Sequence, residues 1–355
     1  MKLNKVFSLI LGMGLFVFPV FSQTTLLTDL QTRVNEFSES LVKSLPFNAA
    51  IGLNWSDAYI GKVFPSLPPH FGVGVSAGMT SMEIDAFKGL LDMFDAGALG
   101  SVGDLTFMPV PAYATEARVG GVFLPFDLGF KFGILPENSL SLGNVKLSYT
   151  LLGASLRIAP LELLLSGNPL LLVLPNISVG VGVNYLSGGI GDISIGKAIN
   201  FSFTLPGKES NSYTLGLSEP KLGLSWETTA LDFTLQASKN LLVITPYIGV
   251  GVSRATSKAG YGVTTKVKYT ENSIDKELTT DAELKNLRDK LESARLGGID
   301  VDANGFESII ENSGVSFRAF GGLSFNIAVI KIDLTGMFNF TDQNWGVSLG
   351  TRFQL

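Results

Sequence analysis

Alternation of large apolar residues with small or polar ones is the dominant pattern of the chain from residue 71 onward. The segment FDLGFKFG, at 126–133, has phenylalanine or leucine at every even-numbered residue and a charged residue or glycine between them. The segments VSFRAFGGLSFNI (315–327) and IKIDLTGMFNF (330–340) largely repeat this pattern. Because successive side chains of a strand point to opposite faces, each segment predicts a strand with one apolar face.

Similar segments recur along the chain. They lie near 71–79, 145–158, 177–186, 199–205, 213–218, 221–227, 229–238, 243–254 and 260–270. Their lengths and the mixture of short and long connections predict an all-β membrane protein, a transmembrane antiparallel β-barrel of about 14 strands (range 12–16). A soluble sandwich or lipocalin-like barrel also alternates. The 25 phenylalanines, on a face made almost entirely of large residues, favour the membrane barrel.

Three segments have helical periodicity instead. Residues 24–45 and 81–96 carry apolar residues three or four apart, which predicts amphipathic helices that either cap one barrel mouth or plug the lumen. Residues 23–110 are therefore interpreted as a helical or plug region with the first strands, and residues 111–355 as the main part of the barrel. A third helix, at 281–295, falls in a charged outer loop at about 271–312, which is a solvated surface or a ligand or host contact.

The first 22 residues have the features of a secretory signal peptide. Lys2 and Lys5 precede a 13-residue apolar run, and Val20 and Ser22 suit the positions before a cleavage site. We expect cleavage after Ser22 and export of residues 23–355. The chain contains no cysteine, which excludes disulfides, thiolate metal sites and lipid attachment at a cysteine.

Composition narrows the architecture further. The net charge of −5 argues against a nucleic-acid partner. Only 16% of the residues are charged, and the mean hydropathy is +0.33, which indicates a membrane protein. After residue 22 there is no uncharged apolar run of about 18 residues, so a bundle of spanning helices is not expected. A closed barrel is the remaining way to satisfy the backbone in lipid.

The sequence offers little catalytic chemistry. His70 is the single histidine, and no metalloprotease motif, nucleophile elbow or phosphate-binding loop is present. We expect no enzyme, no cofactor and no metal site, with a barrel hydrolase as the weakest hypothesis.

Charged residues that share the parity of the small residues are predicted to face the lumen. They either set ion selectivity or pair across strands and hold a closed barrel together. These candidates are Asp127, Lys131, Arg157, Asp232, Lys331, Asp333 and Arg352.

The signal peptide, the alternating segments and the terminal NWGVSLGTRFQL together resemble bacterial outer-membrane β-barrel proteins. That class ends in an alternating signal read by the barrel assembly machinery, which implies this role for Phe353 and Leu355. A helical segment before the barrel, with FNAA at 47–50, resembles the long-chain fatty acid transporter type and the Asn-Pro-Ala element of its hatch, without the proline.

This resemblance implies location in the outer membrane and contact with its lipid. The leading hypothesis for function is a channel or transporter for passive uptake of small, possibly hydrophobic, solutes, gated by the N-terminal region. The alternative is a non-conducting structural or adhesive surface barrel.

Overall fold

The structure is a computed structural model. It describes residues 23–60, 70–85, 88, 106–120, 124–135, 141–142, 145–194, 199–205, 208–272, 274–276, 281–293, 300–302 and 305–355. The predicted signal peptide at 1–22, with its cleavage site, lies outside the described residues, as does most of the helix predicted at 81–96.

Ten antiparallel strands of the described chain form a closed barrel. Their order around the barrel is β1, β2, β3, β5, β6, β8, β9, β12, β13 and β14, and β14 pairs with β1 to close it. Their bounds are β1 His70–Met82, β2 Met108–Gly120, β3 Phe126–Leu135, β5 Val145–Ile158, β6 Asn176–Ser194, β8 Lys208–Ser238, β9 Ile244–Glu271, β12 Gly305–Ile327, β13 Ile330–Asn339 and β14 Asn344–Gln354.

The prediction of about 14 strands is therefore wrong for the barrel. Two strands, β8 with 31 residues and β9 with 28 residues, each contain segments that the sequence pattern separates. The apparent break in β8 is a shift of register between Ser218 and Lys221, around Pro220. Proline removes one ladder hydrogen bond, and a bulge accommodates that loss without ending the strand.

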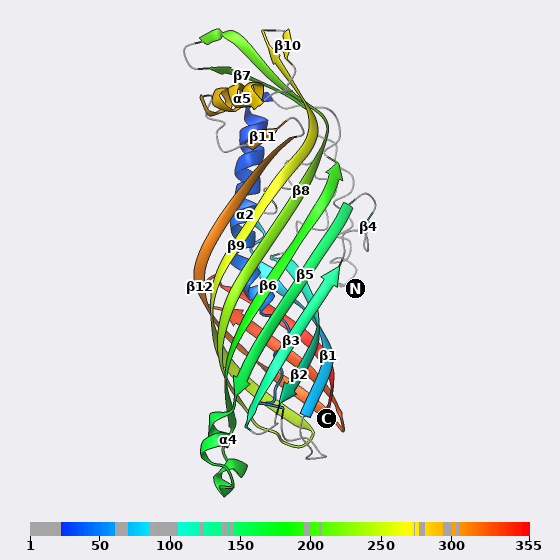
Figure 1. Cartoon of the computed structure of the whole chain (residues 1–355), viewed down its shortest axis with the longest axis vertical. Helices are drawn as coiled ribbons and strands as arrows, with labels where there is room; N and C mark the ends of the chain where they lie inside the picture. The colour runs from blue at the N-terminus through cyan, green and yellow to red at the C-terminus, as the bar shows by residue number, and fades with distance from the viewer. Residues whose placement is uncertain are drawn as a thin grey trace.

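The strands differ greatly in height (Figure 1). β8, β9 and β12 rise well above β13, β14, β1 and β2. We call the end that carries β7 (Ile199–Leu205), β10 (Ile274–Lys276) and α5 (Asp281–Ser293) the upper end. The short strands β4 (Ser141–Leu142) and β11 (Asp300–Asp302) pair with β5 and β12, outside the ring of ten strands.

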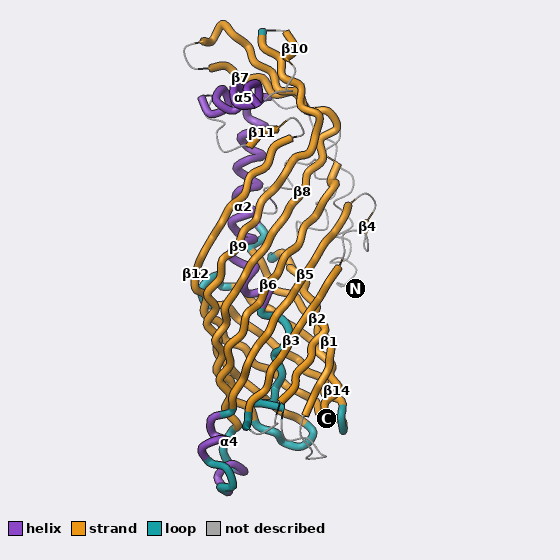
Figure 2. Tube along the Cα trace, viewed as in Figure 1, coloured by secondary structure: helices purple, strands orange, loops and turns teal. Residues whose placement is uncertain are grey.

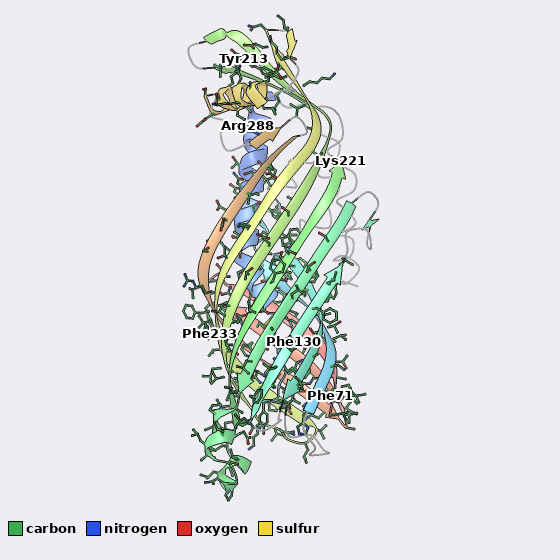
Figure 3. All side chains as sticks on the ribbon, in the orientation of Figure 1. Phe71, Phe130, Tyr213, Lys221, Phe233 and Arg288 are labelled. Atoms are coloured by element: carbon green, nitrogen blue, oxygen red, sulfur yellow. The ribbon has the colours of Figure 1, made fainter. Side chains whose placement is uncertain are left out.

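The outside of the lower barrel is apolar. Phe71, Phe130 and Phe233 point away from the wall and are 44%, 53% and 52% exposed (Figure 3). Every one of the ten barrel strands contributes exposed large apolar side chains to this surface. We call this surface the apolar band, and it is the face that the alternating pattern predicts.

The apolar band ends abruptly at the upper end of the tall strands. Thr229, Thr256 and Ser313 lie side by side on the outside of β8, β9 and β12, and we call these three residues the threonine row. Two residues further up, Glu227, Lys258 and Glu311 form the next row. We call the tall strands above the threonine row the upper wall, and its outward surface is mainly polar, with Ile309 as an exposed apolar exception.

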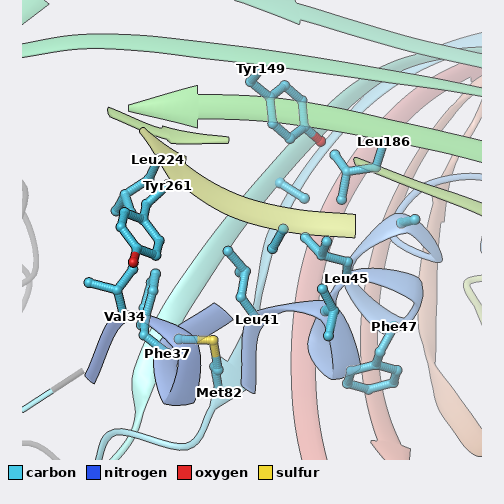
Figure 4. Close-up of a cluster of buried hydrophobic side chains, with 14 of the residues drawn as sticks. Val34, Phe37, Leu41, Leu45, Phe47, Met82, Tyr149, Leu186, Leu224 and Tyr261 are labelled. Atoms are coloured by element: carbon cyan, nitrogen blue, oxygen red, sulfur yellow. The ribbon is translucent and has the colours of Figure 1, made fainter. Parts of the chain in front are cut away.

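Helix α2 (Gln23–Ala49) lies inside the strands along the barrel axis (Figure 1). Its buried side chains include Val34, Phe37, Leu41 and Leu45, on the face that the predicted spacing indicates. They pack against inward side chains of the wall, including Leu186, Leu224 and Tyr261 (Figure 4). Of the two predicted placements, cap and plug, the structure has the plug.

Helix α5 occupies the outer loop, close to where the sequence predicts a helix. Lys290 of α5 donates to the Tyr269 hydroxyl at 3.0 Å and to the Glu271 carboxylate at 3.3 Å. Its ammonium also lies 5.0 Å from the ring centre of Tyr213. Burial acts to lower the pKa of Lys290, but the interactions with Tyr269 and Glu271 outweigh it and raise the pKa. These contacts attach α5 to the upper wall.

The lower end carries helix α4 (Pro160–Leu164) and the 3₁₀ helix η3 (Pro169–Leu172), which project below the strands between β5 and β6 (Figure 2). In the part of the chain that the structure describes, no helix has the length and apolar character needed to cross a membrane.

Candidate functional site

The candidate site is the lower lumen, where the chain that follows α2 passes between the walls. We call residues 49–60 the plug segment. Gly52 has φ of +89° and Leu53 has φ of +59°, so the backbone leaves the helical conformation just after α2 ends. Ile51, Trp55 and Ile60 of this segment are buried. The plug segment therefore fills the lower lumen, beyond the end of α2.

Basic side chains of neighbouring strands hold the backbone of the plug segment. Lys131 of β3, Arg118 of β2 and Arg157 of β5 donate to carbonyl oxygens at alternate positions. The contacts run from Lys131 to Ala49 at 2.6 Å and Ile51 at 2.7 Å, from Arg118 to Leu53 at 2.9 Å, and from Arg157 to Trp55 at 3.2 Å and Asp57 at 2.8 Å. These carbonyls lose their hydrogen bonds to water when the plug segment is buried, so each needs a donor from the protein.

Strand β8, which is separated from β5 only by β6, adds further donors to the same backbone. Gln236 of β8 donates to the carbonyls of Trp55 at 3.1 Å and Ser56 at 3.0 Å. Side chains of β2, β3, β5 and β8 thus hold the backbone of the plug segment.

Asp57 connects the plug segment to the last two strands. Its carboxylate accepts from Lys331 of β13 at 2.7 Å and from Arg352 of β14 at 2.9 Å. Arg352 also lies 3.2 Å from Asp333. Lys331 and Arg352 therefore share one carboxylate of the plug segment.

Asp127 forms the second centre of charge. It is fully buried, and its carboxylate pairs with Arg118 at 2.6 Å and with Arg157 at 2.7 Å. It also accepts from the backbone amide of Ile60 at 2.9 Å. Asp127 thus orients the two arginines that hold the plug carbonyls and binds the end of the plug segment itself.

Trp55 is the large side chain of the plug segment at this level. Its ring lies 4.5 Å from the guanidinium carbon of Arg352 and 5.6 Å from that of Arg118, and its indole N–H donates to Glu116. A Cβ at Gly72 would lie 2.8 Å from this ring, so the wall needs glycine there.

A third cluster lies within the wall. Asp232 of β8 pairs with Arg318 of β12 at 2.8 Å and accepts from Ser253 and Asn184. Among the described residues, the ion pairs and hydrogen bonds of Asp232 and Arg318 are made with wall strands and not with the plug segment. This cluster joins wall strands to one another.

The seven predicted lumen residues all have buried side chains. Five of them contact the plug segment directly, and Asp333 is connected to it through Arg352. Asp232 belongs to the wall cluster. The seven residues are Asp127, Lys131, Arg157, Asp232, Lys331, Asp333 and Arg352. All but Lys131, which binds carbonyls, form ion pairs.

Sequence reasoning missed Glu116, Arg118 and Asp57. Glu116 and Arg118 share a parity with Ala112 and Ala114 on β2, and this signal was available. The outward positions of that strand carry little apolar bulk, so it did not stand out. Asp57 lies in a segment without periodicity.

The other predicted residues have simple positions. Phe353 is exposed on the outward face of β14, and the backbone amide of Leu355 donates to Phe71 of β1 at 2.9 Å. His70 is buried at the first residue of β1. Among the described residues, no three His, Cys, Asp or Glu side chains are grouped as a metal site would require.

Little space remains around the plug segment. Two cavities of about 20 Å³ and 60 Å³ lie beside it, enough for isolated water molecules. A larger space of about 380 Å³ lies higher up, against the charged face of α2 that carries Arg33, Glu36 and Lys43. The plug segment therefore occupies most of the space between the described strands at this level.

No protein-family model matches the chain, and no curated protein matches it. Among solved structures, the translocator domain of the autotransporter NalP from Neisseria meningitidis has a TM-score of 0.35 and 8% identity, covering 91% of this chain and 99% of its own. The TodX monoaromatic hydrocarbon channel deltaS2 mutant has a TM-score of 0.24, 7% identity and coverage of 81% and 91%. A Pseudomonas aeruginosa FadL homologue has a TM-score of 0.23 and 8% identity, covering 80% of this chain and 90% of its own. These distant likenesses carry no information about activity.

Proposed function

We propose that the protein is an outer-membrane barrel closed at rest by its own plug segment, and that displacement of this segment opens a hydrophilic passage for small solutes. The single observation that carries this proposal is the polar interface between plug and wall. Alternate carbonyls of the plug segment are held by charged wall side chains, so water can replace these contacts when the segment leaves.

The apolar band supports the membrane location. All ten strands contribute exposed aliphatic or aromatic side chains to the band. In water, the barrel would therefore expose an exceptionally large apolar surface. Lipid of the outer membrane is therefore the proposed partner of the band. The barrel assembly machinery is the proposed partner of β14, through Phe353 and Leu355, and no nucleic acid is involved.

The nature of the solute follows from the lining. Arg118, Lys131 and Arg157 would face the passage if the plug segment moved away, together with the carboxylate of Asp127. A charged lining favours small polar solutes, in contrast to the hydrophobic solutes that the resemblance to the fatty acid transporter type implied. We propose no catalytic activity, because the sequence has a single histidine and no catalytic motif.

A disulfide lock tests the gate directly. A Cβ at Gly52 would lie 3.4 Å from the Cβ of Ala114, close to the separation that disulfides span. Because the sequence contains no cysteine, Gly52→Cys and Ala114→Cys introduce the only two thiols. Gly52→Cys is strained at a φ of +89°, and this strain is common to the oxidised and reduced forms that are compared. They are combined with Asp57→Ala, which removes the carboxylate shared by Lys331 and Arg352.

In planar bilayers, we expect the native chain to be silent and Asp57→Ala to show transient openings. The triple variant should be silent when oxidised and show openings after reduction. If oxidised and reduced protein conduct equally, or if loosening the plug segment never produces conductance, the passage is refuted.

A second candidate, a surface barrel that binds an external partner, rests on the upper wall. β8, β9 and β12 extend far beyond the apolar band, and α5 is fixed to them by Lys290 (Figure 1). A barrel that only conducts does not need this extension. Silence of every plug variant, together with binding that is lost when α5 is replaced by a short linker, would favour this candidate.

A further inference from the structure

The lower end of the barrel exposes apolar side chains beyond the last residues of the strands. Between β5 and β6, residues 160–174 form α4 and η3, and we call this segment the foot (Figure 2). Leu164 and Val173 of the foot are 77% and 78% exposed, and Leu163 and Leu170 are at least half exposed. These are unusual values for aliphatic side chains in a segment with defined structure.

The foot carries almost no charge. Leucine occupies most of its positions, and its single charged residue, Glu162, is buried. The polar residues Ser166 and Asn168 are confined to its tip, where the Asn168 side chain accepts from the amide of Leu170. The flanks of the foot are therefore apolar and its tip is polar.

A neighbouring turn extends the same surface. Residues 241–243, between β8 and β9, expose Leu241, Leu242 and Val243, with Leu242 at 87%. Lys239 joins the two elements, because its ammonium donates to the Leu174 carbonyl at 2.8 Å. The foot and this turn form one projection below the strands β5 to β9.

This projection continues the apolar band. Ile158 at the end of β5, Val179 near the start of β6 and Leu235 near the end of β8 are exposed members of the band next to it. At the upper end of β8, β9 and β12, in contrast, the threonine and charged rows separate the band from the polar wall. No such row separates the band from the foot among the described residues.

We propose that the foot lies in the boundary between the headgroups and acyl chains of the membrane leaflet at the lower end, and that lipid covers it. A surface that is continuous with the lipid-facing band is covered by the same phase. Apolar flanks with a polar tip match segments that lie in this boundary. The inference rests on the membrane location proposed above and assigns a lipid contact to a segment outside the barrel wall.

Single nitroxide labels test this placement, because the chain has no native cysteine. Leu164→Cys and Val173→Cys report on the foot in the full chain, reconstituted in lipid vesicles. Phe130→Cys is the control within the apolar band, and Ser313→Cys is the control on the upper wall. All four positions are exposed, so the labels leave the barrel interior intact, and heat-modifiable migration in gels verifies folding.

Collision with oxygen and with a water-soluble nickel chelate is measured on both sides of the vesicles. We expect the two foot labels to be shielded from nickel and accessible to oxygen, as at Phe130→Cys, with nickel collision several-fold below that at Ser313→Cys. Nickel accessibility at the foot equal to that at Ser313→Cys overturns the inference, because it places the foot in water. Nickel accessibility at Phe130→Cys would instead refute the membrane location itself, so the two failures are distinguishable.

Discussion

The ammonium of Lys331 lies 2.7 Å from the carboxylate of Asp57, although 274 residues separate them in the chain. This ion pair joins the plug segment to β13, and both side chains are largely shielded from water. Removal of one member of a buried pair costs about 3–5 kcal/mol, because the other charge is left without compensation. Asp57→Ala should therefore lower the free energy of unfolding in lipid vesicles, which urea titration followed by tryptophan fluorescence measures.

The double variant Asp57→Ala with Lys331→Met provides the control for this prediction. It removes both charges, and Arg352 keeps Asp333 as a partner at 3.2 Å. We expect the double variant to recover part of the lost stability. Equal losses in the single and double variants would show that the ion pair itself contributes little.

Asp127 and Asp232 offer a matched comparison between plug and wall. Each carboxylate is buried and paired with arginine, so Asp127→Asn and Asp232→Asn should both destabilise the barrel by about 3 kcal/mol or more. Only Asp127 binds the Ile60 amide and orients the arginines that hold the plug carbonyls. Openings in planar bilayers are thus expected for Asp127→Asn alone. Similar conductance in both variants would mean that loss of stability, rather than release of the plug segment, opens the lumen.

Lys131 tests whether the plug segment is held through its backbone. Lys131→Met keeps the length of the side chain but leaves the carbonyls of Ala49 and Ile51 without a donor. An unsatisfied buried carbonyl costs about 1–3 kcal/mol, so stability should fall and openings should appear. A silent Lys131→Met variant would argue against backbone recognition.

The faces of the strands are the part of this structure that the sequence predicts well. Lys331 and Asp333 share a parity on β13, and both are buried, while Ile330 and Leu334 are exposed outside. Strand alternation has a fixed period of two, so parity transfers directly from the sequence to the two sides of the wall. The same argument places Phe353 outside and Arg352 inside.

The number of strands could not be read from the same pattern. Above Thr229 and Thr256 the outward face of β8 and β9 is no longer apolar, so the alternation fades although the strands continue. Hydrophobic periodicity reports the medium that a face meets, and it loses its signal where the wall leaves the apolar band. The fading was interpreted as the end of a strand.

The plug contacts escape sequence analysis for another reason. Lys131, Arg118 and Arg157 bind carbonyl oxygens, which every residue of the plug segment possesses. Residues such as Ile51 and Leu53 therefore carry no side-chain signal of their role. The charged wall residues could be predicted from parity, but their partners could not.

Val250 and Thr256 test the position of the upper membrane boundary. Both side chains are exposed on the outside of β9, Val250 within the apolar band and Thr256 in the threonine row. An arginine on the lipid face costs about 2–4 kcal/mol near the midplane and about 0–1 kcal/mol near the interface. Val250→Arg should therefore destabilise the reconstituted barrel strongly, and Thr256→Arg should have little effect in the same urea titration. Because both changes add the same side chain to one face of one strand, equal effects would show that the band does not contact lipid.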